Sequence, residues 1–176
     1  MNIWHDIEPE RISPESFVAV IEISKGGKNK YELDKSTGLL KLDRVLFTSM
    51  HYPANYGFIP RTYSDDFDPL DVLVLCSESI VPLTLVSCSP IGILKMIDDG
   101  QTDEKIIAVC NNDPFYNMYT DINDLPPHLF AEIRHFYEVY KTLEHKETVV
   151  KEIENSTKAK QIIKKCMENY IEKFGE

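Results

Sequence analysis

The sequence predicts an α+β fold that is mainly β, a small closed or partly closed barrel with helices packed outside it. In the first two-thirds of the chain, short apolar runs follow one another and are separated by Pro and Gly. In the last third, the apolar residues recur with a helical period. With 176 residues, of which 43% are hydrophobic, and no internal repeat or linker, residues 1–176 are expected to form a single domain.

The predicted strands are short runs rich in β-branched and other apolar residues. They lie at residues 17–23, 30–34, 38–47, 71–75, 83–89, 91–97 and 105–109. Turn signals such as Gly26-Gly27, Pro53 and Pro90 separate these runs. A later run at residues 147–153, between two helical segments, predicts one more strand.

Two helices are predicted near the C-terminus. Residues 126–143 carry Leu129, Ile133 and Phe136 on one stripe, as an amphipathic helix does. Residues 155–175 repeat this pattern, with Asn155 or Ser156 as the N-cap. These helices are expected to cover the outside of the barrel.

Charge and composition restrict the function. The formal net charge of −10 disfavours nucleic acid and anionic membranes as partners, because phosphate backbones are bound by clustered Lys and Arg. A small phosphate substrate stays compatible with this charge if metal ions supply positive charge. No signal peptide or membrane-spanning apolar run is visible, and the four Cys residues match no zinc pattern. A cytoplasmic protein with reduced thiols is expected.

The stretch YSDDFDPLDVLVL, residues 63–75, places four Asp residues before a buried strand. Pro69 can bend the chain so that Asp66, Asp68 and Asp71 converge on one pocket. Converging carboxylates repel one another unless a cation lies between them, and hard divalent cations prefer such oxygen ligands. A solvated acidic loop is the alternative, and the spacing fits an EF-hand poorly.

A second acidic cluster lies at residues 96–105, where a short loop containing Gly100 is expected to join two strands. Asp98 and Asp103 are expected to face each other near the base of this hairpin. Lys105 lies two residues beyond Asp103 and therefore points the same way. A solvated hairpin loop is the alternative, but two acidic clusters at strand ends favour a shared metal site.

Two charges interrupt apolar strands: Glu22 has the parity of Val18, and Arg44 has the parity of Leu40. A charge among apolar residues needs a partner, so either these two residues form an internal ion pair or they line a polar cleft. In a cleft, Arg44 and Lys30 are able to grip phosphate oxygens. The tyrosines are either packing residues or hydrogen-bond donors to phosphate or bound water.

Several ordered motifs together resemble the family I soluble inorganic pyrophosphatases, most closely the prokaryotic branch. The motifs are KYELDKSTGLLKLDRVL, YPANYGFIP, DDFDPLDVLV, PIGILKMIDDG, DEKIIAV and HFYEVYK. The family motif D-x-D-P-x-D is present with Asp66, Asp68 and Asp71 as its acids. The resemblance implies a five-stranded OB-like closed barrel and hydrolysis of pyrophosphate to two phosphates by a metal-activated water.

The resemblance also implies roles for individual residues. Asp68 is the expected general base, with Tyr56 beside the attacking water. Mg²⁺ is the expected cofactor, several ions per site, with Mn²⁺ or Zn²⁺ as substitutes, and the expected ligands are Asp66, Asp71, Asp98, Asp103 and Glu22. The residues expected to bind phosphate are Lys30, Arg44, Tyr56, Lys105, Tyr140 and Lys141. Glu32 and Tyr52 match polar positions of the site, and prokaryotic members are commonly hexamers.

Two other functions stay open at this level: a related hydrolase of nucleotides or polyphosphate, and a non-catalytic OB-type binding module. The chain also departs from the family pattern at Phe67, where a Gly or a small polar residue is frequent. A second departure is Glu152-Ile153, where the family often has a Gly-Trp pair, and we expect it to affect packing more than catalysis.

Overall fold

The computed structural model describes residues 1–175. The strands are β1 (Phe17–Ile23), β2 (Asn29–Leu33), β3 (Leu40–Val45), β4 (Asn55–Ile59), β5 (Leu70–Leu75), β6 (Leu85–Asp98), β7 (Gln101–Cys110) and β8 (Thr148–Asn155). The α-helices are α1 (Pro127–Val139) and α2 (Ser156–Phe174). Short 3₁₀ helices are η1 (Pro9–Arg11), η2 (Ile122–Asp124) and η3 (Thr142–Glu144).

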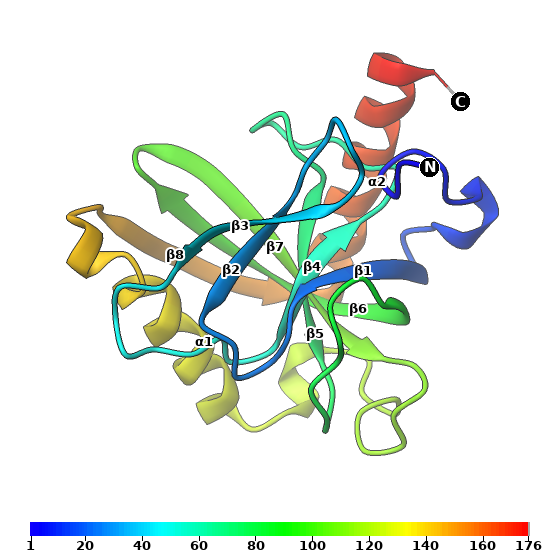
Figure 1. Cartoon of the computed structure of the whole chain (residues 1–176). Helices are drawn as coiled ribbons and strands as arrows, with labels where there is room; N and C mark the ends of the chain where they lie inside the picture. Colours follow the sequence, from blue (N-terminus) through cyan, green and yellow to red (C-terminus); the bar gives the residue numbers. More distant parts are fainter. Residues whose placement is uncertain (176) are drawn as a thin grey trace.

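Five strands form a closed ring in the order β1-β4-β5-β7-β6, because β6 also pairs with β1. Strands β5 and β7 run parallel, and the other neighbours in the ring run antiparallel. Strand β8 extends the sheet beyond β6, and β2 and β3 form a separate two-stranded ribbon (Figure 1). The predicted mainly β, OB-like ring with helices outside it is confirmed.

Two elements differ from the sequence prediction. The runs at 83–89 and 91–97 are one strand, β6, which continues through Pro90. The pairing register of β6 with β7 shifts between Pro90 and Gly92, and this irregularity accommodates a residue that lacks a backbone N–H. Strand β4 was not predicted, because the segment around Gly57 lies between two prolines and reads as a turn.

Alternate residues of β5 enter two different apolar cores. Val72 and Val74 belong to a core that α2 covers, whereas Leu73 and Leu75 belong to a core that α1 covers. The two helices therefore cover different parts of the sheet, and the N-terminus lies near α2 (Figure 1).

The C-terminal helix begins and ends where the sequence predicts. The side chain of Asn155 accepts a hydrogen bond from the backbone N–H of Lys158 at 3.1 Å, so it is the N-cap. Gly175 ends the helix with a φ of 82°. Among the helices in residues 1–175, none is long and apolar enough to span a membrane.

Candidate active site

The charged residues of the site continue the apolar faces that enter the α1 core. On β5, Asp71 shares the parity of Leu73, and on β7, Lys105 shares the parity of Ile107. Asp98 likewise follows the core residues of β6. Because strand side chains alternate, each of these faces changes from apolar to charged at the same end of the core.

These charges line one cavity of about 610 Å³. Its lining includes every predicted catalytic, metal-binding and phosphate-binding residue except Arg44, together with Glu32 and Tyr52. The residues brought together are Glu22, Lys30, Tyr56, Asp66, Asp68, Asp71, Asp98, Asp103, Lys105, Tyr140 and Lys141. They come from β1, β2, β4, the β4–β5 loop, β5, β6, β7 and the end of α1.

Lys105 is buried at the base of the cavity and contacts three of its members. Its Nζ lies 3.0 Å from Asp71 Oδ2 and 3.1 Å from Asp103 Oδ2, and it donates to Tyr56 Oη at 3.1 Å. Burial disfavours the ammonium, but Asp103 and Asp71 outweigh it and raise the pKa of Lys105 well above its usual range. Lys105 is therefore a fixed positive charge.

Several carboxyl groups here are hard to ionise. Burial, followed by the charge of Asp71, raises the pKa of Asp66 to about 6 and that of Glu22 to about 8. Burial also raises the pKa of Asp103. Burial is the first cause of each shift, and the negative charge of Asp71 adds to it.

The donor set fits a divalent cation. All the predicted ligands supply carboxylate oxygens, and Asp98 Oδ1 is buried with no hydrogen-bond partner among the described residues. Within residues 1–175, no three acidic, His or Cys side chains already form a ready metal cluster. The ammonium of Lys105 lies against both Asp71 and Asp103.

Lys141 and Lys30, two further cations of the cavity, are also paired with acids. Lys141 Nζ lies 2.5 Å from Asp98 Oδ2, and Tyr140 Oη donates to the same oxygen at 3.4 Å. Lys30 forms an ion pair with Glu32. The ammonium groups of Lys30 and Lys141 are thus neutralised by carboxylates of the protein itself.

Arg44 is held apart from the cavity lining. Its Nε lies 2.7 Å from Glu144 Oε1, and its guanidinium also pairs with Asp43. The internal pair with Glu22 is not formed, since the Glu22 carboxylate accepts instead from the backbone N–H of Leu33 at 3.0 Å. Arg44 also lacks the expected apolar surroundings, because strand β3 is largely exposed.

The hairpin of β6 and β7 is offset from the expected arrangement. Asp98 is opposite Gln101, and Asp103 is opposite Met96. Asp98 and Asp103 therefore share a face but are displaced along it, instead of facing each other directly. The prediction that these two residues lie directly opposite each other was wrong, because the register of the hairpin differs. With this register, Asp98 forms an ion pair with Lys141.

The loop of residues 64–68 carries Asp66 and Asp68 and is closed by its own bonds. The Ser64 N–H donates to the Asp68 carbonyl at 2.8 Å, and the Asp68 N–H donates to Asp66 Oδ1 at 3.2 Å. Between them, Phe67 has a φ of 69°, in the left-handed region. The sharp turn aims the two acids into the cavity.

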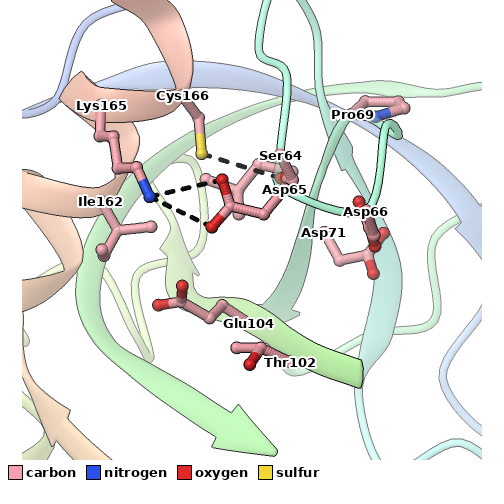
Figure 2. Close-up of a pocket in the computed structure, with 11 residues that line it drawn as sticks. Ser64, Asp65, Asp66, Pro69, Asp71, Thr102, Glu104, Ile162, Lys165 and Cys166 are labelled. Atoms are coloured by element: carbon pink, nitrogen blue, oxygen red, sulfur yellow. Dashed lines mark hydrogen bonds and ion pairs between the residues drawn. The ribbon is translucent and has the colours of Figure 1, made fainter. Parts of the chain in front are cut away.

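Asp65 faces the other way, toward α2. Its carboxylate lies 3.2 Å from Lys165 Nζ, and Ser64 Oγ lies 3.7 Å from Cys166 Sγ. Figure 2 shows this reverse side of the loop, where Lys165 and Cys166 face Asp65 and Ser64 across a small cavity. Of the three acids of the loop, Asp68 lines only the large cavity, Asp65 only the small cavity beside α2, and Asp66 lines both.

Comparison with known proteins identifies the family. A family model described as inorganic pyrophosphatase matches residues 19–171. The chain is 48% identical over 171 residues to "Soluble inorganic pyrophosphatase 2" of Chlamydomonas reinhardtii, covering 97% of this chain and 89% of that protein. This chain belongs to the inorganic pyrophosphatase family.

Other members of the inorganic pyrophosphatase family agree in sequence and in structure. "Soluble inorganic pyrophosphatase 1" of Arabidopsis thaliana is 50% identical over 169 residues, which are 96% of this chain and 80% of that protein. The crystal structure of inorganic pyrophosphatase from Thermus thermophilus superposes with a TM-score of 0.92 at 36% identity, covering 97% of this chain and 99% of that one. The resemblance stated from the motifs is confirmed.

The structure adds three residues that sequence reasoning left out of this inorganic pyrophosphatase site. Lys35 lines the cavity from the turn after β2, and Tyr137 lies under Lys105, whose Nζ is 5.4 Å from its ring centre. Glu144 holds Arg44. Tyr137 was indicated only as part of an apolar helical stripe, and Lys35 and Glu144 carry no local signal that distinguishes them from surface charges.

Proposed function

We propose that this chain hydrolyses inorganic pyrophosphate to two phosphates. One observation carries the proposal: a single cavity contains both a set of crowded carboxylates and a set of Lys and Tyr side chains suited to phosphate oxygens. Membership of the inorganic pyrophosphatase family supports the same activity. Nucleotide and polyphosphate hydrolysis are outcomes of a substrate panel in which pyrophosphate is expected to react fastest.

The residues that would hold divalent metal are Asp66, Asp71, Asp98, Asp103 and Glu22. We propose Mg²⁺ as the metal because every donor is a hard carboxylate oxygen, with Mn²⁺ or Zn²⁺ as substitutes. When bound, such ions would neutralise phosphate charge and lower the pKa of a bound water toward neutrality. Raised carboxyl pKa values at Asp66 and Glu22 support a site that gains from added positive charge.

The chain's own cations bind the substrate. Lys30, Lys105 and Lys141 are buried or half-buried and are paired with acids. Phosphate oxygens replace these carboxylates as partners, and Tyr140 donates a further hydrogen bond. Arg44 lies across the ribbon from Lys30 and would grip the same phosphate after leaving its carboxylate partners.

Asp68 is the proposed general base. Its carboxylate lines the cavity and is half exposed, so it can meet a water molecule there. As the water oxygen attacks phosphorus in line, the water's proton passes to Asp68 and the bond from phosphorus to the bridging oxygen breaks. Tyr56, whose hydroxyl accepts a hydrogen bond from Lys105, is the proposed group that orients the attacking water.

Phosphate release from pyrophosphate, with and without Mg²⁺, tests this proposal. Asp68→Asn is expected to lower kcat by about 10²-fold or more, because it removes the proton acceptor while keeping the side-chain shape. The matched control is Asp65→Asn, which makes the same chemical change on the α2 side of the loop. Equal activity of the two variants would exclude Asp68 as the base, and no metal-dependent release by the wild type would exclude the function.

We further propose a cytoplasmic homo-oligomer, with a hexamer as the expected state. Similarity to relatives named soluble supports the cytoplasmic part, and the hexamer rests on the resemblance to prokaryotic family members. Light scattering coupled to size-exclusion chromatography measures the mass directly. A mass near that of one 20.3 kDa chain at micromolar concentration would exclude a stable oligomer.

A further inference from the structure

Lys35 belongs to a well-ordered turn at the rim of the cavity. Asp34, just before it, accepts hydrogen bonds from the Ser36 N–H at 3.2 Å and from Thr37 Oγ1 at 2.8 Å, which closes the turn after β2. The Lys35 carbonyl accepts from Asn2 Nδ2 at 3.0 Å. The backbone of Lys35 is therefore held both by its own turn and by the N-terminal segment.

The side chain of Lys35 reaches across to the loop of residues 64–68. Its ammonium pairs with the Asp68 carboxylate and lies 3.5 Å from the carbonyl oxygen of Phe67. It also lies 5.7 Å from the ring centre of Trp4. One ammonium thus joins the N-terminal segment, the β2–β3 turn and the loop that carries the proposed base.

The two contacts that Lys35 makes with the loop are at Phe67 and Asp68, where the loop backbone is least usual. Phe67 has a φ of 69°, and its ring is 69% exposed, so packing of this side chain does little to hold the backbone. Elsewhere the loop is held by an internal bond from the Phe67 N–H to the Ser64 carbonyl at 3.0 Å, and by α2 only at its first two residues, Ser64 and Asp65. Lys35 supplies a contact from outside at the Phe67–Asp68 peptide.

We propose that Lys35 is a positioning residue that fixes the loop of residues 64–68 and, through it, the carboxylate of Asp68. The catalytic part of this inference rests on the proposed function. Lys35 and Asp68 are half exposed, at 50% and 51% of their side chains, and exposed ion pairs contribute little to overall stability. Loss of Lys35 should therefore change the geometry of the loop and leave global unfolding nearly unchanged.

Three variants test the proposal: Lys35→Met, Lys35→Arg and the control Lys25→Met. Lys25 is an exposed lysine of the turn after β1 and does not line the cavity. For Lys35→Met we expect kcat to fall by about tenfold, because small displacements of a catalytic group are costly, while KM changes less than about twofold. Lys35→Arg keeps the cation and should recover most of kcat, and Lys25→Met should match the wild type.

Hydrogen exchange of the metal-free proteins gives a readout that does not depend on activity. Deuterium uptake in the peptide containing residues 64–68 should be faster in Lys35→Met than in the wild type and Lys25→Met. An unchanged kcat overturns the proposal, and so does a lower kcat with unchanged exchange, which would mean that Lys35 acts on substrate directly. If wild type and Lys25→Met both release no phosphate, the proposed function fails. In that case the hydrogen exchange still tests the loop contact: uptake in Lys35→Met equal to that of the wild type would overturn it.

Discussion

Phe67, like Leu83, has a backbone conformation that is unusual for a bulky residue. Its φ of 69° suits Gly or Asn, whereas a bulky side chain there is an outlier. Packing of the ring contributes little stability, because Phe67 is 69% exposed and its aromatic neighbour, Tyr63, has a ring centre 6.2 Å away. The conformation is therefore imposed by the loop that aims Asp66 and Asp68.

Phe67→Asn is expected to stabilise the protein by about 1 kcal/mol, because the left-handed conformation costs an ordinary residue roughly 1–2 kcal/mol and Asn tolerates it. Urea unfolding measures the change in free energy. The control is Phe115→Asn, since that ring is 73% exposed and its backbone has no positive φ. A gain of the same size in both variants would show that ring exposure, and not backbone conformation, is responsible.

Asp113 is expected to link stability to acid pH. Its carboxylate accepts hydrogen bonds from the Ser77 N–H at 2.6 Å and the Phe115 N–H at 2.9 Å, and these bonds lower its pKa to about 2. In the unfolded chain the pKa of Asp is about 3.9. Because the folded pKa is the lower one, Asp113 stabilises the protein fully above about pH 4, and this contribution is lost as the pH falls through about 2.

Asp113→Asn should lower the free energy of unfolding at pH 7, because the amide nitrogen cannot accept one of the two bonds. The difference from the wild type should narrow between pH 4 and pH 2 in urea unfolding. Glu15→Gln, at an exposed acid before β1, should show no such narrowing. A difference for Asp113→Asn that is constant over this pH range would contradict the assignment.

At the scale of elements, the sequence predicts what depends on local pattern. Strand β1 coincides with the predicted run 17–23, and α2 begins after the predicted cap Asn155. Strand β4 was missed because its pairing is long-range: it lies between β1 and β5 and has no strong pattern of its own. The path of β6 through Pro90 was missed for the same reason, since a bulge is specified by the partner strand as well.

Gly57 shows how closely β4 must approach β1. A Cβ at this position would lie 1.8 Å from the Val20 carbonyl oxygen, which is backbone and cannot turn aside. Gly57→Ala should therefore lower the free energy of unfolding by about 3 kcal/mol or more, as overpacking against rigid neighbours does. Urea unfolding measures it.

Gly100→Ala is the control for Gly57→Ala. Gly100 has a φ of 80°, and a methyl group added there would meet no atom within 4 Å, so only backbone strain of roughly 1–2 kcal/mol is expected. If Gly57→Ala were no more destabilising than Gly100→Ala, the close approach of β4 to β1 would be wrong.

At the scale of the whole molecule, the site joins residues from Glu22 on β1 to Lys141 after α1. Sequence motifs identified nearly all of these residues, because carboxylates at strand ends and the D-x-D-P-x-D spacing are local signals. What the motifs could not predict is the pairing between them. The contacts of Lys35 with Asp68 and of Glu144 with Arg44 join segments far apart in the chain, so only the fold brings them together.

The crowding of carboxylates in the cavity determines how the stability of the protein should respond to a divalent metal. The chain has a formal net charge of −10, and its carboxylates are most crowded in the cavity, where burial and mutual repulsion raise the pKa of Asp66 and Glu22. A divalent cation bound there removes a repulsion that opposes folding. Because the ligands come from several strands and the loop before β5, this stabilisation should extend to the whole fold.

Adding Mg²⁺ at about 100 times its Kd should therefore stabilise the metal-free protein by about 2.7 kcal/mol. For a chain of this size that corresponds to a rise in Tm of about 5–10 °C in a thermal shift measurement. Asp71→Asn should lose most of the rise, whereas Asp65→Asn, on the α2 side of the loop, should keep it. A rise of the same size with NaCl at equal ionic strength would mean that salt screens the net charge, and a rise retained in Asp71→Asn would place the metal elsewhere.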